Sequence, residues 1–427
     1  MSANSLARAA ACGIDFGTSN STAGVAGTGV SDGTGTLLAL EGGKLTLPSV
    51  IFFHAEDAHV SYGRAALADY LAGHDGRLMR SLKSLLGTAM MDDFTEVAGR
   101  AVMFKDLLAT FIGELKRRAE QSAGQPFTRA VLGRPVFFVD DDAAADQRAE
   151  DTLRGIAMQV GWQEVGFQYE PIAAAFDYES TLSREELVLV VDIGGGTSDF
   201  TLIRLSPGRA KKADRKADIL ASSGVHIGGT DFDRALNLAS VMPTLGLGSL
   251  LKSGLQMPSS HYFNLATWHT INLAYTRKAA AQIADLQRDA RDKTKLARLQ
   301  TLVEERSGHW LAIQVEAAKI ALSDATSTEM NLGRIAPGEH LVLHRPDFDG
   351  AINVLVNRVE ATISRLLLDA GVTAAGVDTV FFTGGSSGVP LLRDRIAAVL
   401  GGARAVEGDR FGSIGAGLAL DAQRRFG

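Results

Sequence analysis

The sequence contains a single cysteine, Cys12, among its 427 residues, so no internal disulfide can hold the fold together. Because Cys12 leads into an apolar run, we expect it to be a buried small hydrophobic residue. No apolar run approaches the roughly 20 residues needed to cross a bilayer, and the first residues do not read as a secretory signal. These absences favour a cytoplasmic protein that does not insert into a membrane.

Neither sign of charge is in large excess. The 43 basic and 49 acidic residues give a net charge of −6 at pH 7, so the chain has no general positive field for nucleic acid or anionic lipid. We therefore expect neither as a partner. Apolar residues make up 46% of the chain and charged residues 22%, which is typical of a globular protein with a sizeable core. The length predicts two or more domains.

Apolar, β-rich segments alternate with segments of helical periodicity, which predicts an α/β fold. We expect strands at 12–16, 22–26, 36–40, 129–138, 187–193, 199–205, 218–222 and 378–383. We expect helices at 63–73, 104–122, 143–161, 171–180, 230–241, 310–324, 350–370, 389–399 and 413–424. Residues 281–307 are highly charged with apolar residues at helical spacing, which predicts a solvent-exposed helical arm.

Two segments of the chain share one pattern: GIDFGTSNSTAGV at 13–25 and VDIGGGTSDFTLI at 191–203. Each has an apolar strand, an aspartate (Asp15 or Asp192), a glycine-rich bend, small hydroxyl residues and a second apolar strand. An ordinary hairpin turn does not need an aspartate at the end of a buried strand. We therefore interpret the pair as an internal repeat of two phosphate-binding hairpins, one in each half of the chain.

The residue types in these bends suit a metal-bound polyphosphate. Glycines 194–196 let the backbone approach an anion and direct successive N–H groups at it, and Thr18 and Thr197 add hydroxyl donors. An aspartate beside a polyphosphate requires a cation between them, and Mg²⁺ keeps most of its water ligands when it binds. We therefore expect Asp15 and Asp192 to hold hydrated Mg²⁺.

Two further glycine turns extend the pattern. HIGGTDFDRAL at 226–236 places Gly228 and Gly229 before a helix that Thr230 or Asp231 caps, and a helix N-terminus can receive an anion. VFFTGGSSGVPLL at 380–392 again reads as a strand, a glycine turn and a helix. Each turn alone is typical of a plain strand–helix connection, but with the two hairpins they predict a nucleotide site.

These four motifs together resemble the ATPase domain of the DnaK-type (70-kDa heat-shock) chaperones. The resemblance covers essentially the whole chain and is supported by QYEPIAAAFDYE, IGGTDFD, AKIALS and FGSIGAGLA at 168–179, 227–233, 318–323 and 411–419. Within the family it is greatest to the short bacterial YegD-like proteins that lack the substrate-binding domain. It implies an actin-like ATPase (ribonuclease H-like) duplicated α/β fold, in which two lobes, each with an inner and an outer subdomain, surround a central cleft for ATP or ADP.

The resemblance also implies domain boundaries. They are lobe I at 1–186 with an outer subdomain at about 41–103, lobe II at 187–408 with an outer subdomain at about 224–335, and a C-terminal helix at 409–427 that returns to lobe I. Since the sequence ends just after this helix, we expect no substrate-binding domain.

The outer part of lobe II, at about 242–310, departs from the family pattern. It carries a dense group of aromatic residues, namely Tyr262, Phe263, Trp268 and Tyr275. Such a group is a candidate surface for a protein partner, but such residues more often form the core of a small subdomain.

Individual roles follow from the resemblance, position by position. Lys83 matches the lysine that contacts the attacking water and the γ-phosphate, and Glu170 matches the glutamate near the metal shell. Thr197 and Asp199 match positions that orient the water. The remaining nucleotide-binding positions correspond to Gly17, Thr18, Ser19, Asn20, Gly194, Gly195, Gly196, Gly228, Gly229, Thr230, Glu316, Lys319, Ser323, Gly384, Gly385, Ser386 and Asp409.

Each of these residues also has an ordinary structural interpretation. Lys83 alone would be an exposed lysine, Glu170 a helix-start residue before Pro171, and Asp409 a cap. Glu316, Lys319 and Ser323 share one helix face, which would otherwise be an ordinary polar face.

Two positions depart from the family near the expected adenine. Ile320 replaces an adenine-stacking arginine, and Gly388 replaces a second arginine. Loss of two guanidinium groups removes stacking and hydrogen bonds, so we expect the base to be held weakly or differently, while the phosphate and metal positions are retained.

Our working hypothesis is a chaperone-like switch that hydrolyses Mg²⁺-ATP slowly. A nucleotide-binding interaction protein with little turnover is an alternative that the substitutions at Ile320 and Gly388 keep open. A small-molecule kinase of the same fold is another, although the sequence offers no base distinct from Asp199 and no sugar-binding signature. An actin-type filament is less favoured.

Overall fold

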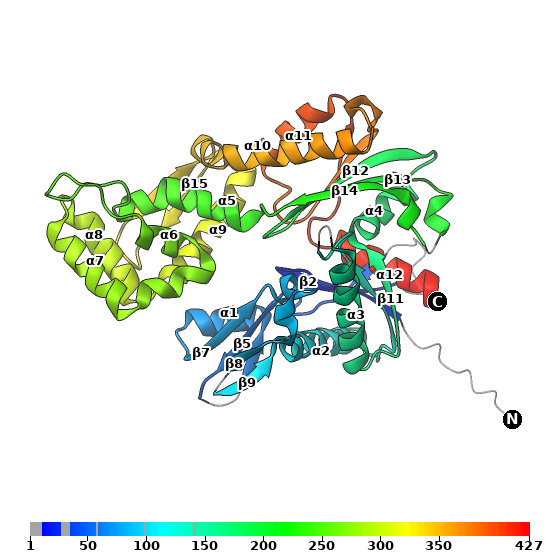
Figure 1. The fold of residues 1–427 in the computed structure, drawn as a ribbon, viewed down its shortest axis with the longest axis horizontal. Coiled ribbons are helices and arrows are strands. Elements are labelled where there is room, and N and C mark those ends of the chain that lie inside the picture. Colours follow the sequence, from blue (N-terminus) through cyan, green and yellow to red (C-terminus); the bar gives the residue numbers. More distant parts are fainter. Residues whose placement is uncertain (1–10, 27–34, 57–58, 98, 140–141, 213) are drawn as a thin grey trace. The chain divides into compact units, whose positions relative to one another are not determined.

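A computed structural model describes residues 11–26, 35–56, 59–97, 99–139, 142–212 and 214–427 (Figure 1). The chain divides into two compact units. Unit 1 comprises residues 1–224, 362–387 and 397–427, and unit 2 comprises residues 225–361 and 388–396. Among the described residues, no helix has both the length and the apolar character that a bilayer span requires.

The first sheet of unit 1 contains the predicted N-terminal hairpin. Its order is β11-β10-β1-β2-β3, and β4 also pairs with β2. β1 is antiparallel to β2 and parallel to β10, which is parallel to β11. The bounds are β1 (Ala11–Asp15), β2 (Asn20–Val25), β3 (Thr36–Leu37), β4 (Thr46–Pro48), β10 (Arg129–Arg134) and β11 (Glu164–Tyr169).

The second sheet repeats this arrangement, with the order β14-β13-β12-β17-β18. β12 is antiparallel to β13 and parallel to β17, which is parallel to β18. The bounds are β12 (Glu186–Ile193), β13 (Ser198–Leu205), β14 (Ile219–Val225), β17 (Thr379–Thr383) and β18 (Arg404–Glu407). Each sheet thus contains the same parts. A hairpin lies in the middle, a third strand lies beside the second hairpin strand, and two parallel strands lie beside the first hairpin strand. The duplicated fold that we expected is confirmed.

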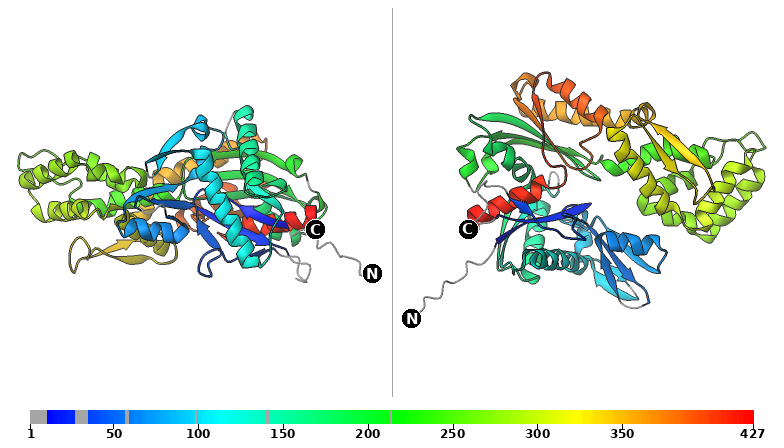
Figure 2. Two further views of the ribbon diagram at one scale, coloured as in Figure 1. Left: turned by 90° about the horizontal axis from the view of Figure 1, so that it is seen from below. Right: turned by 180° about the vertical axis from the view of Figure 1, so that it is seen from behind.

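Helices α4 (Glu170–Ser180) and α12 (Ser413–Phe426) join the two sheets of unit 1. Val131 of β10, Val188 of β12, Phe176 of α4 and Leu418 of α12 belong to one buried cluster. In the views of Figure 2 the red helix α12 runs beside the blue strands of the first sheet, in agreement with its contacts to β1 and β2.

The packing of α12 depends on glycines. A Cβ on Gly417 would lie 1.9 Å from the Ala173 carbonyl oxygen, and one on Gly13 would lie 2.2 Å from the Ala419 nitrogen. Such distances leave no room for any side chain, so the backbones of β1, α12 and α4 approach each other directly.

Two longer helices complete the core beside the first sheet. They are α2 (Phe104–Ala123) and α3 (Ala143–Gln159). Cys12 is fully buried there with Phe111 and Trp162, which confirms its interpretation as a core residue. The strand expected at 129–138 ends at Arg134 instead, because Pro135 follows and has no N–H for the sheet ladder.

A small outer part of unit 1 lies between β4 and α2. It contains β5 (Val50–His54), β6 (Val60–Tyr62), α1 (Gly63–Leu71), β7 (Gly76–Arg80), β8 (Phe94–Val97) and β9 (Arg100–Met103). β5 pairs with both β6 and β7, and β8 pairs with β9. A short 3₁₀ turn, Leu82–Leu85, follows β7 and carries Lys83.

Unit 2 is mainly helical. Its elements are α5 (Gly229–Leu236), α6 (Ser260–Ala266), α7 (Arg277–Asp289), α8 (Lys293–Glu304), α9 (Gly308–Asp324), β15 (Ser327–Asn331), β16 (His340–His344) and the greater part of α10 (Arg345–Asp369) and α11 (Pro390–Leu400). The helix expected at 230–241 continues past α5 as a π-helical turn, Asn237–Val241.

The prediction of a solvent-exposed arm at 281–307 is wrong. The segment forms two helices, α7 and α8, that pack on each other, and Ile283, Leu296 and Leu299 are fully buried or nearly so. The apolar residues at helical spacing therefore face a core rather than solvent.

The aromatic group of this region is mostly internal. Tyr262 is fully buried and its hydroxyl donates to the Leu245 carbonyl at 3.2 Å. The Tyr275 hydroxyl accepts from the Gly308 N–H at 2.8 Å, and Trp268 meets His309 edge-on. Only Phe263 of the four is an exposed large hydrophobic residue. The interpretation of these aromatic residues as the core of a small subdomain therefore holds for Tyr262 and Tyr275.

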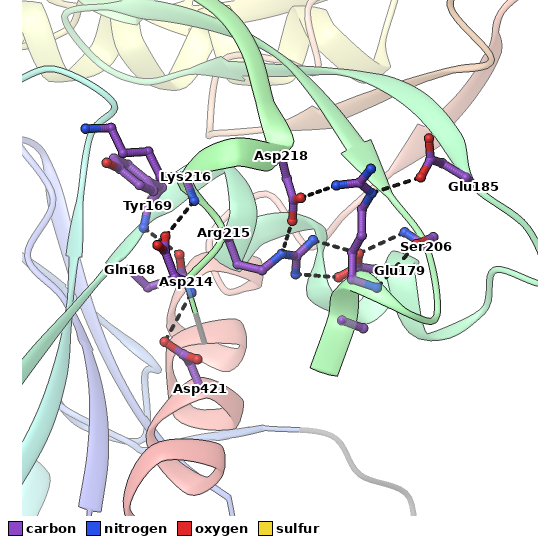
Figure 3. Close-up of polar contacts among 12 residues, drawn as sticks. Gln168, Tyr169, Glu179, Glu185, Ser206, Asp214, Arg215, Lys216, Asp218 and Asp421 are labelled. Atoms are coloured by element: carbon purple, nitrogen blue, oxygen red, sulfur yellow. Dashed lines mark hydrogen bonds and ion pairs between the residues drawn. The ribbon is translucent and has the colours of Figure 1, made fainter. Parts of the chain in front are cut away.

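A buried charge network fixes the segment that follows β13 (Figure 3). Arg215 has no exposed side-chain surface and binds Glu179 of α4 through two hydrogen bonds of 2.9 and 2.8 Å. It also pairs with Asp218, and Glu179 accepts the Ser206 N–H at 3.0 Å. A buried guanidinium is tolerated only when its charge is matched, and here two carboxylates match it.

We expect Glu179→Gln to lower the free energy of unfolding by about 3 kcal/mol, because it breaks a buried ion pair from one side. Glu185→Gln is the matched control, since Glu185 is 45% exposed and pairs with Arg209, and it should change the value by less than about 1 kcal/mol. Urea unfolding followed by circular dichroism measures both. Equal effects of the two substitutions would contradict this account of the network.

Candidate functional site

The first predicted bend is held from outside the hairpin. Asp15 ends β1 and is 8% exposed. Ser49, between β4 and β5, donates its hydroxyl to the Gly17 carbonyl at 2.6 Å and its N–H to the Ser19 carbonyl at 2.9 Å. Sequence reasoning missed Ser49, because only the tertiary fold brings it to the bend.

The second bend is closed by its own backbone and faces the first. The Gly194 N–H donates to the Thr197 carbonyl at 2.9 Å, and the Thr197 hydroxyl donates to Asp199 Oδ2 at 2.9 Å. Asp192 lies opposite Asp199 across the β12–β13 pair. A Cβ on Gly195 would lie 2.2 Å from Ser19 Oγ, so the two bends approach each other.

The predicted turn at 384–386 lies against Asp192. Gly384 has φ +83°, and a Cβ there would lie 2.3 Å from Asp192 Oδ1, so both the backbone and the contact require glycine. The Ser386 N–H donates to the Ile193 carbonyl at 2.9 Å. Gly385 is covered instead by the Phe411 ring, which a Cβ would approach to 2.8 Å.

Lys83 and Glu170 form an ion pair inside this group. Lys83 Nζ lies 2.5 Å from Glu170 Oε1, and their side chains are only 9% and 13% exposed. Glu170 is the first residue of α4. The interpretation of Lys83 as a solvent-exposed lysine is therefore wrong, and a buried lysine in a short 3₁₀ turn needs a specific partner.

The carboxylates of the cluster repel one another. Burial, followed by the charge of Glu170, raises the pKa of Asp15 to about 7, against the opposing charge of Lys83. Burial and then Asp199 raise the pKa of Asp192 to about 8. Burial acts to lower the pKa of Lys83, but Glu170 and Asp15 outweigh it and the net pKa is raised. The ammonium of Lys83 thus opposes the charges of three carboxyl groups, those of Glu170, Asp15 and Asp192.

These residues fit a hydrated divalent cation. Asp15 Oδ1 is buried without a hydrogen-bond partner among the described residues, and all the donors are the hard oxygens that Mg²⁺ prefers. Within the part of the chain that the structure describes, no three of these carboxylates bring oxygens within 4.8 Å of one another. An ion that keeps its own water ligands suits this spacing better than one that needs a full protein cage.

A pocket opens on the same side chains. Glu170, Asp192 and Asp199 line it, and its other walls are Pro135, Val136, Phe137, Pro171, Thr201 and residues 222–224. A Cβ on Gly224 would lie 2.9 Å from Asp199 Oδ1. Sequence reasoning missed these walls, although the proline directly after a buried strand at 135 marks where β10 ends beside the site.

The remaining predicted residues of the helical face lie in unit 2. Lys319 of α9 is buried, with Nζ 2.9 Å from Asp233 Oδ1 and 3.2 Å from the Gly229 carbonyl, to which it donates. It therefore ties α9 to the start of α5. Ile320 is 56% exposed, and Glu316 is also exposed. Ser323 donates to the Lys319 carbonyl at 3.3 Å.

Asp231 and Asp409 make different contacts near the starts of α5 and α12. Asp231 lies in the first turn of α5 and accepts the Gly228 N–H at 3.0 Å, which is a capping contact at the start of this helix. Asp409 accepts the Phe411 N–H at 3.1 Å, and its carbonyl accepts the Ser413 hydroxyl at 2.7 Å. The structural role of Asp409 is thus a turn before α12, while its contact with nucleotide stays a prediction.

Asp192→Asn tests the electrostatic account. An unfolded aspartate titrates near pH 3.9, so a folded pKa of about 8 means that stability is full below pH 4 and is lost as the pH rises through 8. The asparagine side chain of this variant cannot ionise. We expect its free energy of unfolding to exceed that of the wild type by at least about 1 kcal/mol at pH 8.5, with a smaller difference at pH 5.

Chemical unfolding at a series of pH values measures this difference. Millimolar Mg²⁺ should reduce it at pH 8.5, because the ion would compensate the charge of the wild type. A difference that does not depend on pH would show that Asp192 is not under electrostatic strain.

Comparison with known proteins agrees with this geometry. The family model described as Hsp70 protein matches residues 11–240 and 288–422. Chaperone protein HscA homologs of Shewanella oneidensis (strain MR-1) and Shewanella sp. (strain MR-4) are 28% and 27% identical to the chain over 96% of its length. The chain spans 58% of the length of these relatives. Because the family model covers most of the chain, including both hairpins and the Lys83–Glu170 pair, the chain belongs to the Hsp70 family.

Proposed function

We propose that the protein binds Mg²⁺-ATP and hydrolyses it slowly, and that the two nucleotide states form a switch of the chaperone type. The observation that carries this proposal is the Lys83–Glu170 ion pair at 2.5 Å, set beside two facing glycine bends whose aspartates have raised pKa values. A buried lysine amid excess negative charge suits a site that receives phosphate and a cation together. Membership of the Hsp70 family favours ATP as the nucleotide.

We assign separate roles in nucleotide binding to the residues of unit 1. Backbone N–H groups of the two bends would receive phosphate oxygens, as glycine-rich nests do, and Asp15 and Asp192 would hold the waters of Mg²⁺. Bound Mg²⁺ would supply charge neutralisation at the phosphates. Lys83 stays protonated, because its pKa is raised, and it would contact the γ-phosphate.

In this proposal, the attacking water lies beside Asp199. The Thr197 hydroxyl donates to Asp199 at 2.9 Å, which orients the carboxylate that would hold the water, and Glu170 fixes the lysine on the other side. Phosphoryl transfer needs positioning and electrostatic stabilisation more than covalent help. We therefore assign these residues to positioning and expect slow turnover.

The relatives are named as chaperones, and we extend that role to this chain as part of the proposal. ATP hydrolysis would change the conformation of the protein, and a partner protein would respond to the change. A partner that binds one nucleotide state more tightly than the other would shift the balance between the two states.

Lys83→Ala and Asp199→Ala should each lower phosphate release by at least about 100-fold, the loss typical when one group that stabilises or positions the transition state is removed. Lys44→Ala is the control, because Lys44 is exposed. A malachite-green assay measures turnover, and calorimetry confirms that the variants still bind ATP. Wild-type turnover in Lys83→Ala would remove the assignment, while ATP binding without turnover in the wild type would favour the nucleotide-binding alternative.

Ile320→Arg tests how the base is held. A guanidinium on this exposed face should stack on adenine and raise ATP affinity roughly three- to tenfold, since a cation–π contact contributes about 1 kcal/mol. Val342→Arg is the control, because Val342 is similarly exposed at 54% but lies on β16. Calorimetric titration with ATP measures the effect. Equal affinities in both variants and the wild type would show that the base does not use this face of α9.

A further inference from the structure

A second group of metal-binding side chains lies in the outer part of unit 1. Three of the nine histidines in the sequence, His54, His59 and His74, fall within residues 54–74. His54 ends β5, His59 comes just before β6, and His74 follows α1, which also carries Asp69. None of these residues belongs to the phosphate site.

The fold brings these side chains together. One ligand atom each from His54, His59 and Asp69 all lie within 4.8 Å of one another, the only such group of three in the described residues. His54 Nε2 is 3.1 Å from Asp69 Oδ2. The ring of His54 lies 5.1 Å from that of His59 and 5.5 Å from that of His74, between centroids. His54, His59 and Asp69 therefore form one group of ligand atoms, and the His74 ring lies beside His54.

The surroundings hold two of the donors in place. The Phe52 ring meets the His54 ring edge-on at 4.7 Å, and the side chains of His54 and Asp69 are 14% and 29% exposed. His59 is more exposed and gives the group access to solvent.

A simple histidine–aspartate hydrogen bond would explain only part of this geometry. It accounts for His54 and Asp69, but it does not account for the ligand atom of His59 in the same group or for the His74 ring beside His54. Imidazoles gain little from one another's proximity in water, whereas a cation among them would gain from each neutral ring nitrogen.

We propose that His54, His59 and Asp69, with His74 as a fourth donor, bind Zn²⁺ or a divalent ion of similar softness. Zn²⁺ takes nitrogen and carboxylate ligands at about 2.0–2.2 Å in a tetrahedron, which places ligand atoms roughly 3.3–3.6 Å apart. The His54–Asp69 separation of 3.1 Å is already near this value, and the ligand atom of His59 lies within 4.8 Å of both. Mg²⁺ and Ca²⁺ are not the ions of this site, because they prefer oxygen ligands alone.

Such an ion would cross-link elements that are otherwise joined by short turns. It would tie the end of β5 to α1 and to the turn that leads into β7. The stability of this small subdomain would then depend on the metal concentration, as for any ligand that binds only the folded state.

Titration of the full-length chain with Zn²⁺, in excess Mg²⁺, tests the proposal. We expect one Zn²⁺ per chain by calorimetry and d–d absorption bands with Co²⁺ as a probe. His54→Ala, His59→Ala and Asp69→Asn should each weaken Zn²⁺ binding at least tenfold. His340→Ala is the matched control, because His340 forms a similar pair with Glu329, at 2.6 Å in unit 2, and it should leave binding unchanged within twofold.

Two further measurements separate this site from the phosphate site and from nonspecific binding of Zn²⁺. Asp192→Asn should bind Zn²⁺ like the wild type, since the phosphate site uses oxygen ligands. Zn²⁺ should raise the melting temperature of the wild type but not that of His59→Ala, whose exposed position leaves the metal-free fold intact. The proposal is overturned by an absence of stoichiometric Zn²⁺ binding, by wild-type affinity in the three site variants, or by loss of binding in either control.

Discussion

The arrangement of the site depends on one electrostatic constraint: the charge of a single buried lysine opposes the charges of Glu170, Asp15 and Asp192. Mutual repulsion and burial raise the pKa values of Asp15 and Asp192 to about 7 and 8, so full ionisation near neutral pH works against the folded state. Lys83 relieves part of this repulsion through its pair with Glu170. The free energy that holds the remaining charges together must come from elsewhere in the fold, as is common at functional sites.

That free energy comes from the duplicated sheets and the helices between them. Each aspartate ends a strand that is almost entirely buried, and the apolar residues of α4 and α12 join both sheets in one core. The contacts at Gly13 and Gly417 are backbone to backbone, which leaves little freedom for one hairpin to retreat from the other. Repulsion at the bends is therefore resisted by the close packing of the strands and helices beside them.

Sequence patterns predicted the parts of the site that are made of residues close together in the chain. The strands of both hairpins are apolar runs followed by a glycine bend, so their type and the position of an aspartate at each bend could be inferred, and the resemblance pointed to Lys83 and Glu170. Short strands such as β15, whose sequence STEMN has little apolar character, offered no such signal. Ser49 and Gly224 reach the site only through tertiary contacts. Periodicity at Leu296 and Leu299 was visible, but the surrounding charge led to the wrong prediction of a solvated arm.

The residues that we propose for phosphate and metal binding lie in one unit of the chain, and the two positions that depart from the family pattern lie in the other. Asp15, Lys83, Glu170, Asp192 and Asp199 all belong to unit 1, whereas Ile320 and Gly388, the two departures from the family pattern, belong to unit 2. On α9 the neighbouring Lys319 is retained, and its ammonium is engaged by Asp233 and the Gly229 carbonyl. A helix can keep this structural lysine while the adjacent exposed position changes freely. If the protein binds nucleotide as we propose, loss of the arginines would alter how the base is held and would leave the charge balance of Lys83 and the carboxyl groups of unit 1 unchanged.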